Sequence, residues 1–132
     1  MNIQSFAKQD IALGQLETAL ELFFAKGDLF SVITLAGASE EILGQLLQER
    51  SGGQGFSGAL TSIFQILRPR NRKQKDKEGI SGQEIGNLVH LDPQQEAVFL
   101  LGRAIEDYIA LAGAPSAGMV KFMSEVSLQG RG

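Results

Sequence analysis

Cysteine is absent from this chain, and histidine occurs once, as His90. Without cysteine the chain has no means of forming a disulfide, a thiolate nucleophile or a zinc–sulfur site. A single histidine is too few for a histidine-rich metal site within one chain. Long apolar runs are also missing, so the sequence predicts no membrane-spanning helix. Together these absences argue against the commonest redox, zinc-dependent and membrane-embedded classes of protein.

The composition is that of one ordinary globular domain. Hydrophobic residues make up 43% of the 132 residues, which is enough for a single core, and we expect one domain over residues 1–132. At this length a second copy would add buried area to a small core. Residues 1–9 have neither the basic cluster nor the apolar core of a signal peptide, so we expect a cytoplasmic protein.

Two amphipathic helices are predicted near the N-terminus, over residues 5–26 and 29–49. The apolar residues of the first recur at helical spacing and form one stripe: Phe6, Leu13, Leu16, Leu20 and Phe23. Gly27 is expected to end this helix in a left-handed conformation. Asp28 then fits the N-cap of the second helix, because its carboxylate can accept hydrogen bonds from the first free amides.

Small residues interrupt the apolar face of the second helix. Its inward positions are expected to be Val32, Leu35, Ala36, Ile42, Leu43 and Leu46. The run Ala36-Gly37-Ala38-Ser39 leaves little bulk between this backbone and a neighbour. We interpret the run as a site of close helix packing; the alternative is local weakness, since glycine destabilises a helix interior.

The C-terminal half carries the clearest helix boundaries. Asp92 and Pro93 predict the N-cap and first residue of a helix that ends near Gly113, and Pro115 with Ser116 begins a last helix. The inward residues of the former are expected to be Ala97, Leu100, Leu101, Ala104, Ile105, Tyr108 and Leu111. The apolar residues of the latter are Met119, Val120, Phe122, Met123 and Val126.

A short third helix is predicted over residues 56–67, after a glycine-rich connection. Residues 68–86 lack periodicity and are predicted to form a charged loop, and residues 88–91 are at most a short extended piece. The sequence therefore predicts an all-α fold, an antiparallel bundle of four to five helices with a charged loop between helices three and four.

The net charge of −3 conceals an uneven distribution of charge. Residues 68–78 hold six of the twelve basic side chains and two acids, net +4, which leaves six basic residues and thirteen acids, net −7, elsewhere. Such a cluster can neutralise phosphates. The candidate nucleic-acid contacts are Arg68, Arg70, Asn71, Arg72, Lys73 and Lys75. No aromatic residue accompanies them to stack on a base, and a solvated charged loop is the alternative interpretation.

Two stretches of the chain resemble an uncharacterised bacterial family of small all-helical proteins. The first runs from Gln15-Leu16-Glu17-Thr18-Ala19 through Gly27-Asp28 to Glu41-Ile42-Leu43, and the second from Leu91-Asp92-Pro93 through Ala104 and Tyr108 to Gly113. Members of the family are similar to HEPN-type bundles, which commonly dimerise and often act as ribonucleases or as nucleotide-binding partners of toxin systems. The resemblance implies a helical fold and a homodimer.

The active HEPN signature is an arginine followed four to six residues later by a histidine. Arg70-Asn71 matches the start of that signature, but residues 74–77 contain no histidine. The departure weakens the inference of ribonuclease activity. The resemblance therefore implies fold and dimerisation more than catalysis.

The remaining titratable residues have simpler interpretations. His90 is a candidate general base or pH-sensitive contact, and otherwise a partly exposed histidine at the entry to a helix. Glu17 with Glu21, and Glu40 with Glu41, could pair for acid–base work or a hard cation. No Glu-x-x-His spacing accompanies these acids, so we expect them on solvated faces.

Two functional hypotheses follow. The first is a non-catalytic interaction or scaffold protein that acts as a homodimer and binds a protein partner. The second is a HEPN-like ribonuclease or nucleic-acid-binding module that uses the basic loop, residues 68–77, on RNA. The sequence offers no nucleophile–base pair, metal-ligand set or cofactor motif, so we expect no cofactor and favour the first hypothesis.

Overall fold

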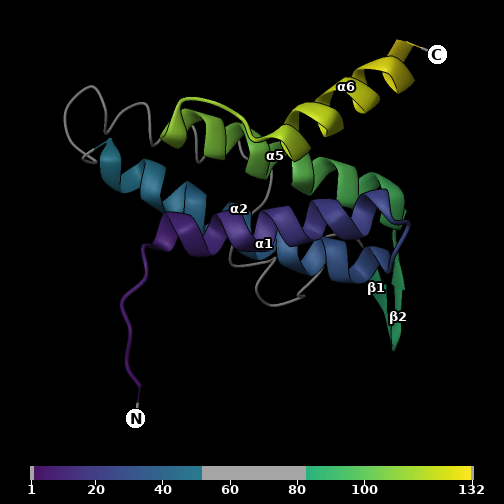
Figure 1. Cartoon of the computed structure of the whole chain (residues 1–132). Helices are drawn as coiled ribbons and strands as arrows, with labels where there is room; N and C mark the ends of the chain where they lie inside the picture. The colour runs from purple at the N-terminus through teal and green to yellow at the C-terminus, as the bar shows by residue number, and fades with distance from the viewer. Residues whose placement is uncertain (1, 52–82, 132) are drawn as a thin grey trace. The chain divides into compact units, whose positions relative to one another are not determined.

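The computed structural model describes residues 2–51 and 83–131, and helices account for most of them. The helices are α1 (Lys8–Phe24), α2 (Leu29–Arg50), α5 (Pro93–Ala112) and α6 (Ala117–Arg131), and a hairpin of β1 (Gln83–Ile85) and β2 (Leu88–His90) precedes α5 (Figure 1). The prediction of a predominantly helical chain is confirmed. The predicted third helix, residues 56–67, lies outside the described residues. Among the described helices, none is long and apolar enough to cross a membrane.

The chain divides into two compact units. The first consists of residues 1–47 and 93–132 and contains α1, most of α2, α5 and α6. The second consists of residues 48–92 and contains the end of α2 and the hairpin. The expectation of one domain over residues 1–132 stays a prediction.

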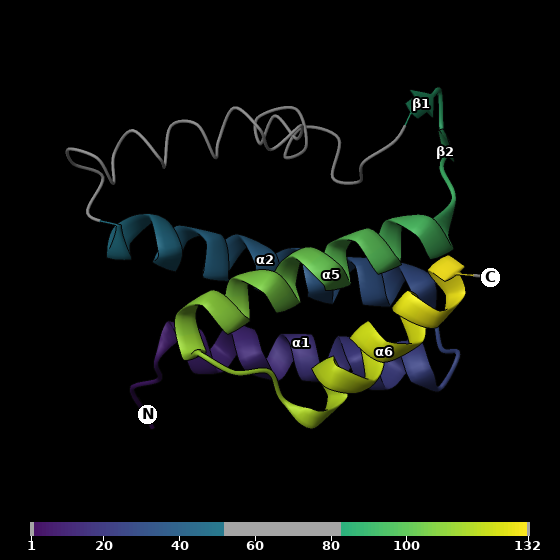
Figure 2. The same ribbon diagram turned by 90° about the horizontal axis from the view of Figure 1, so that it is seen from above.

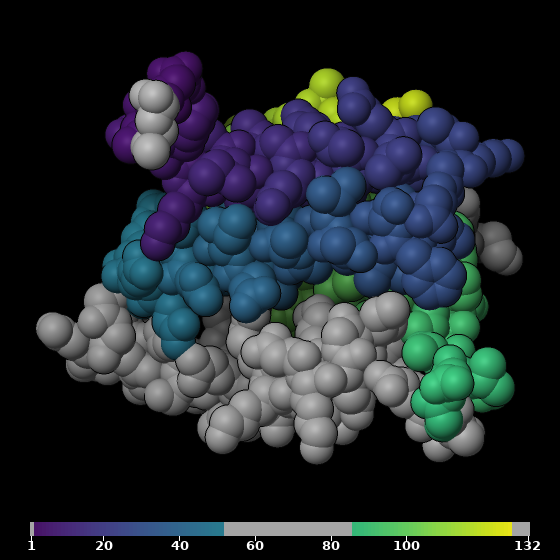
Figure 3. All heavy atoms as spheres, turned by 90° about the horizontal axis from the view of Figure 1, so that it is seen from below, coloured from purple at the N-terminus to yellow at the C-terminus, as the bar shows by residue number. Residues whose placement is uncertain are grey.

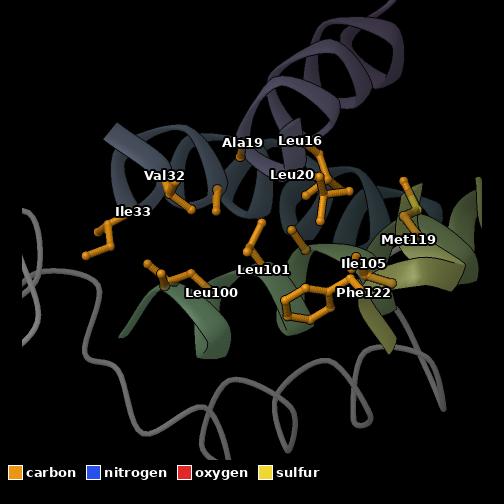
Figure 4. Packing of buried hydrophobic residues seen from close by; sticks show 13 residues of the cluster. Leu16, Ala19, Leu20, Val32, Ile33, Leu100, Leu101, Ile105, Met119 and Phe122 are labelled. Atoms are coloured by element: carbon orange, nitrogen blue, oxygen red, sulfur yellow. The ribbon is translucent and has the colours of Figure 1, made fainter. Parts of the chain in front are cut away.

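One cluster of buried apolar side chains joins the four helices of the first unit. Its buried members are Leu16, Ala19, Leu20, Val32, Ile33, Ala36, Ala97, Leu100, Leu101, Ala104, Ile105, Met119 and Phe122. Figure 4 shows Leu20, Ile105 and Phe122, from three different helices, pointing toward one another. Each large side chain buried in this way contributes about 1.5–3 kcal/mol to folding, so this cluster is the main source of the unit's stability.

The four helices of the first unit are not all antiparallel to their neighbours, which differs from the predicted antiparallel bundle. α1 runs opposite to α2, and α6 turns back from the end of α5, whereas α2 and α5 run in the same direction (Figure 2). Figure 3 shows α1 and α2 lying side by side along one face of the unit. The parallel course of α2 and α5 is compatible with the 42 residues, 51–92, that separate them in the sequence, since helical bundles with parallel neighbours have long crossover connections.

The end of α1 differs from the prediction. The helix starts at Lys8, so Phe6 lies in the preceding extended segment with 67% of its surface exposed, and its predicted place on the buried stripe is wrong. Gly27 does not take the left-handed conformation; Lys26 does, with φ 59°. The amides of Lys26 and Gly27 donate to the carbonyls of Phe23 and Leu22, which is the hydrogen-bond pattern of a Schellman cap.

Gly27 is needed for space rather than for backbone freedom. A Cβ atom at this position would lie 3.1 Å from the Leu22 side chain and 3.3 Å from the Leu22 carbonyl oxygen. The close approach follows from the hydrogen bond that the Gly27 amide donates to the same carbonyl. The tight turn therefore places the start of α2 directly beside the last turn of α1.

The predicted start of α2 is confirmed, and α2 approaches α1 closely at one point of the small-residue run. A carboxylate oxygen of Asp28 accepts hydrogen bonds from the Ser31 amide, 3.0 Å away, and the Ser31 hydroxyl, 2.7 Å away. Further along the helix, the fully buried Ser39 donates its hydroxyl to the carbonyl oxygen of Ala12 on α1, at 2.7 Å. A side chain as short as serine spans the gap only where the two backbones approach closely.

The boundaries of α5 and α6 also match the prediction. Pro93 is the first residue of α5, and the chain leaves that helix through Gly113, with φ 92°. The Ser116 hydroxyl accepts a hydrogen bond from the Met119 amide at 3.4 Å, as an N-cap does. Tyr108 is half-buried and packs against the core, so its interpretation as a core residue is confirmed.

The hairpin was only partly anticipated. Residues 83–86 were predicted to belong to a loop, but Gln83–Ile85 forms a strand that pairs antiparallel with Leu88–His90. Gly86 has φ 63° and is the first of two turn residues, as in a type II′ turn, where a glycine adopts positive φ without strain. Three residues are too short for an alternating apolar pattern, and the dipeptide Gly86-Asn87 was the signal for the turn.

Candidate functional site

The basic run lies outside the described residues. Its members Arg68, Arg70, Asn71, Arg72, Lys73 and Lys75 all fall between residues 52 and 82. Their role in binding nucleic acid therefore stays a prediction from the sequence. The site that can be built from geometry consists of described side chains on α2, α5 and α6.

His90 lies at the end of the hairpin. It is the last residue of β2, its backbone pairs with that of Gln83, and its side chain is exposed. Leu88 and Val89 beside it are exposed as well. The position fits the simpler interpretation, an exposed histidine at the entry to α5.

One of the four acids expected on solvated faces is buried. Glu21 and Glu41 are exposed as predicted, but the surface of Glu40 is 1% exposed, so the prediction for this residue is wrong. Glu17 is partly buried and accepts a hydrogen bond from the Ser116 hydroxyl at 3.3 Å. Glu17 thus connects α1 to the first turn of α6.

Glu40 lies beside a cation from α5. The guanidinium of Arg103 is 4.0 Å from a carboxylate oxygen of Glu40, and the Arg103 side chain is 16% exposed. The same guanidinium lies over the Phe99 ring, 5.6 Å from the ring centroid, within the range of a cation–π interaction. Asp107, one turn further along α5, is buried as well. We refer to Glu40, Arg103 and Asp107 as the buried charge cluster.

Helical spacing alone could have revealed this cluster. Glu40 follows the buried Ile33 by seven residues and Ala36 by four, which places it on the apolar stripe of α2. Arg103 and Asp107 are four residues apart, the spacing of an ion pair on one helix face. The general tendency of charged side chains to stay exposed unless they are paired favoured solvated positions for these acids.

The chemistry open to the buried charge cluster is structural. A carboxylate that water does not reach cannot contact a dissolved substrate unless the helices separate. An isolated buried charge is strongly unfavourable, so the proximity of the Arg103 cation explains how Glu40 is accommodated. Within residues 2–51 and 83–131, no three acidic or histidine side chains gather as metal ligands do. The cluster is therefore a means of fixing α2 against α5.

Two buried oxygens have no hydrogen-bond partner in the described part of the chain, Oε1 of Gln15 and Oε2 of Glu96. Glu96 lies in the first turn of α5, where the helix dipole favours a negative charge. Gln15 lies in the middle of α1. The two residues do not add a recognisable reactive pair to the buried charge cluster.

The outer face of α6 is a second candidate, for binding rather than chemistry. Val120 and Met123, two of the apolar residues expected on this helix, are 50% and 38% exposed. Within residues 117–127, the part of this helix whose burial is described, Met119 and Phe122 are the buried side chains. Next to them, the Lys121 ammonium lies 4.2 Å from the centroid of the Phe24 ring. Apolar and charged side chains therefore share one accessible helix face.

No protein-family model, curated protein sequence or solved structure matches this chain.

Proposed function

We propose that this chain is a non-catalytic interaction or scaffold protein, a helical protein that acts as a homodimer in the cytoplasm. The observation that carries the proposal is the division of side chains on the described helices. Two acids, Glu40 and Asp107, are buried, while the large apolar side chains of Val120 and Met123 are accessible. This distribution suits a molecule that presents a surface rather than a reactive centre.

The position of the exposed apolar residues supports self-association. Single exposed apolar residues are ordinary, but Val120 and Met123 are one turn apart on the same helix and form a continuous strip. A stable interface buries roughly 800 Å² on each partner, more than one strip provides, so further surface of the chain must contribute. The predicted resemblance to a family that dimerises points in the same direction.

The mass of the purified chain tests the proposal. Light scattering during gel filtration should give twice 14.2 kDa, and the purified protein should show no hydrolytic activity on RNA. A mass of 14.2 kDa over the whole elution profile would contradict the homodimer.

The alternative is a HEPN-like ribonuclease or nucleic-acid-binding module that uses residues 68–77. The charge distribution favours it, since half of the basic side chains of the chain lie within residues 68–78. Arg70-Asn71 resembles the start of the HEPN signature, and the missing histidine argues against cleavage. This alternative predicts binding to single-stranded RNA that weakens steeply as salt is raised, because counterions are released from the phosphates.

One experiment separates the two functions. RNA binding and cleavage are measured at low and high salt with the wild type and with a variant in which Arg70, Arg72, Lys73 and Lys75 are changed to Gln. Salt-sensitive binding that the variant loses would support the alternative, and cleavage would make it an enzyme. Absence of binding at low salt would leave the interaction protein.

A further inference from the structure

We propose that the outer face of α6 is the dimer interface and that two copies of α6 pack against each other antiparallel about a two-fold axis near Met123. This inference rests on the proposed homodimer and specifies where it forms. The residues of this face are Val120, Lys121, Met123, Ser124, Glu125 and Ser127, and all six are exposed. The occupant of the face is therefore a second copy of the same chain.

The order of residues along α6 is self-complementary. In an antiparallel pair centred on Met123, each residue lies opposite the residue at the same distance on the other side of the centre. Lys121 then lies opposite Glu125 of the second copy, and the symmetry repeats this pair. Two ion pairs thus form, each between a lysine of one copy and a glutamate of the other. A parallel pair of helices would instead place like charges together.

Small side chains allow the two helices to approach. Val120, Ser124 and Ser127 follow the helical spacing of four and three, so they form one stripe down the centre of this face. Serine removes bulk at two of the three positions, as Ser39 does where α2 packs on α1. Met123 lies beside the stripe and provides a flexible apolar group close to the two-fold axis.

The charged side of the face is held in place by α1. The Lys121 ammonium rests 4.2 Å from the centroid of the Phe24 ring, and Phe24 itself lies edge-on to Phe23, with ring centroids 6.0 Å apart. Phe23 packs in turn on Phe122, with centroids 5.6 Å apart. This contact restricts the Lys121 side chain before association, so less rotamer freedom is lost when it meets a carboxylate.

Charge reversal tests the pairing directly. Lys121→Glu and Glu125→Lys each turn two attractive contacts of the dimer into repulsive ones, so each variant should raise the dimer dissociation constant by about tenfold or more. Mixed in equal amounts, the two variants should associate with each other. One copy then carries acids at positions 121 and 125 and the other carries lysines there, so both contacts are again attractive. Lys8→Glu on α1 and Glu106→Lys on α5 are matched controls at exposed positions and should leave the constant unchanged.

A single introduced cysteine tests the register, since the chain has none of its own. Residue 124 lies one position from the proposed centre, so residue 124 of one copy and residue 124 of the other are about 3 Å apart along the helix axes. Ser124→Cys should therefore form a disulfide-linked dimer under mild oxidation. Ser127→Cys lies on the same stripe, but its offset is about 12 Å, too far for a disulfide. Circular dichroism confirms that each variant is folded.

The outcomes separate this inference from the homodimer itself. A wild-type dimer that Lys121→Glu and Glu125→Lys do not weaken, or that Ser127→Cys cross-links in place of Ser124→Cys, would overturn the α6 interface and leave the homodimer intact. A wild-type monomer would overturn both. Rescue by mixing, together with cross-linking at residue 124, would establish the antiparallel arrangement.

Discussion

Lys26 holds the turn between α1 and α2 in a conformation that a side chain disfavours. Its φ of 59° belongs to the left-handed region, which costs a residue with a Cβ atom about 1–2 kcal/mol. Its amide nevertheless donates to the Phe23 carbonyl, and the Gly27 amide donates to the Leu22 carbonyl. These two hydrogen bonds and the start of α2 hold Lys26 there, so the strain is local and removable.

Replacing Lys26 by glycine should therefore stabilise the protein. Lys26→Gly should raise the free energy of unfolding by about 1 kcal/mol, measured by urea denaturation, because glycine adopts positive φ without strain. Lys8→Gly, a matched change at the exposed first residue of α1, should give no such gain. An unchanged or lower stability for Lys26→Gly would show that the turn is not strained.

Asp28 makes the start of α2 sensitive to acid. Its pKa lies below its ordinary value of 3.8, first because the Ser31 hydroxyl donates to the carboxylate and second because the Ser31 amide does so. A carboxyl whose pKa is lowered by folding contributes stability that is fully present above its unfolded pKa and is lost as the pH falls through its folded pKa.

The corresponding test compares Asp28→Asn with the wild type. Asparagine caps a helix about as well as aspartate but does not titrate, so the two proteins should differ most above pH 3.8 and converge as the pH falls below it. Thermal unfolding from neutral pH down to acid pH measures this. A stability difference that does not change with pH would show that the Asp28 carboxylate does not contribute through its charge.

Among the elements, α1 and α2 depend on the absence of bulk between them. Ser39 is fully buried and donates to the Ala12 carbonyl at 2.7 Å. Ser39→Leu should therefore lower the free energy of unfolding by about 1–3 kcal/mol, because the larger side chain forces the helices apart. Thr34→Leu, at an exposed position of the same helix, should change it by less than about 0.5 kcal/mol. Equal effects at the two positions would contradict close packing.

The contact between α2 and α5 depends on the buried charge cluster. Arg103→Met leaves the Glu40 carboxylate without this cation and should lower the free energy of unfolding by about 3–5 kcal/mol in urea denaturation. Adding Glu40→Gln to that variant should recover part of the loss, since the remaining group is neutral. If the losses in the free energy of unfolding from the two single changes simply add up in the double variant, the 4.0 Å contact between Glu40 and Arg103 contributes no coupling energy.

Sequence patterns predicted the ends of most described helices but not which polar residues they bury. Asp28 and Pro93 marked helix starts because capping depends on a few neighbouring residues. Periodicity placed Phe6 on the apolar stripe of the first helix, whereas it lies before α1 and is exposed, and periodicity did not show that Val120, an apolar residue of the last helix, faces outward. Periodicity gives the spacing of a stripe and not its width, which depends on how many neighbours cover the helix. Helical spacing places Glu40 on the apolar stripe of α2, but the identity of its cation, Arg103, which is 63 residues away in the sequence, follows only from the fold.

At the scale of the whole molecule, the described helices bury the acids Glu40 and Asp107 and expose the apolar and charged side chains of α6. The contact between Glu40 and Arg103 joins α2 to α5, and we propose that the α6 face serves for association. The central claim is accordingly that the chain works as a homodimer.

Sedimentation equilibrium of the wild-type chain over a dilution series measures this claim most directly. The account predicts a mass of twice 14.2 kDa at high concentration, with dissociation toward 14.2 kDa on dilution. A mass of 14.2 kDa at every concentration would contradict it, and would mean that the exposed strip of Val120 and Met123 serves a purpose other than self-association.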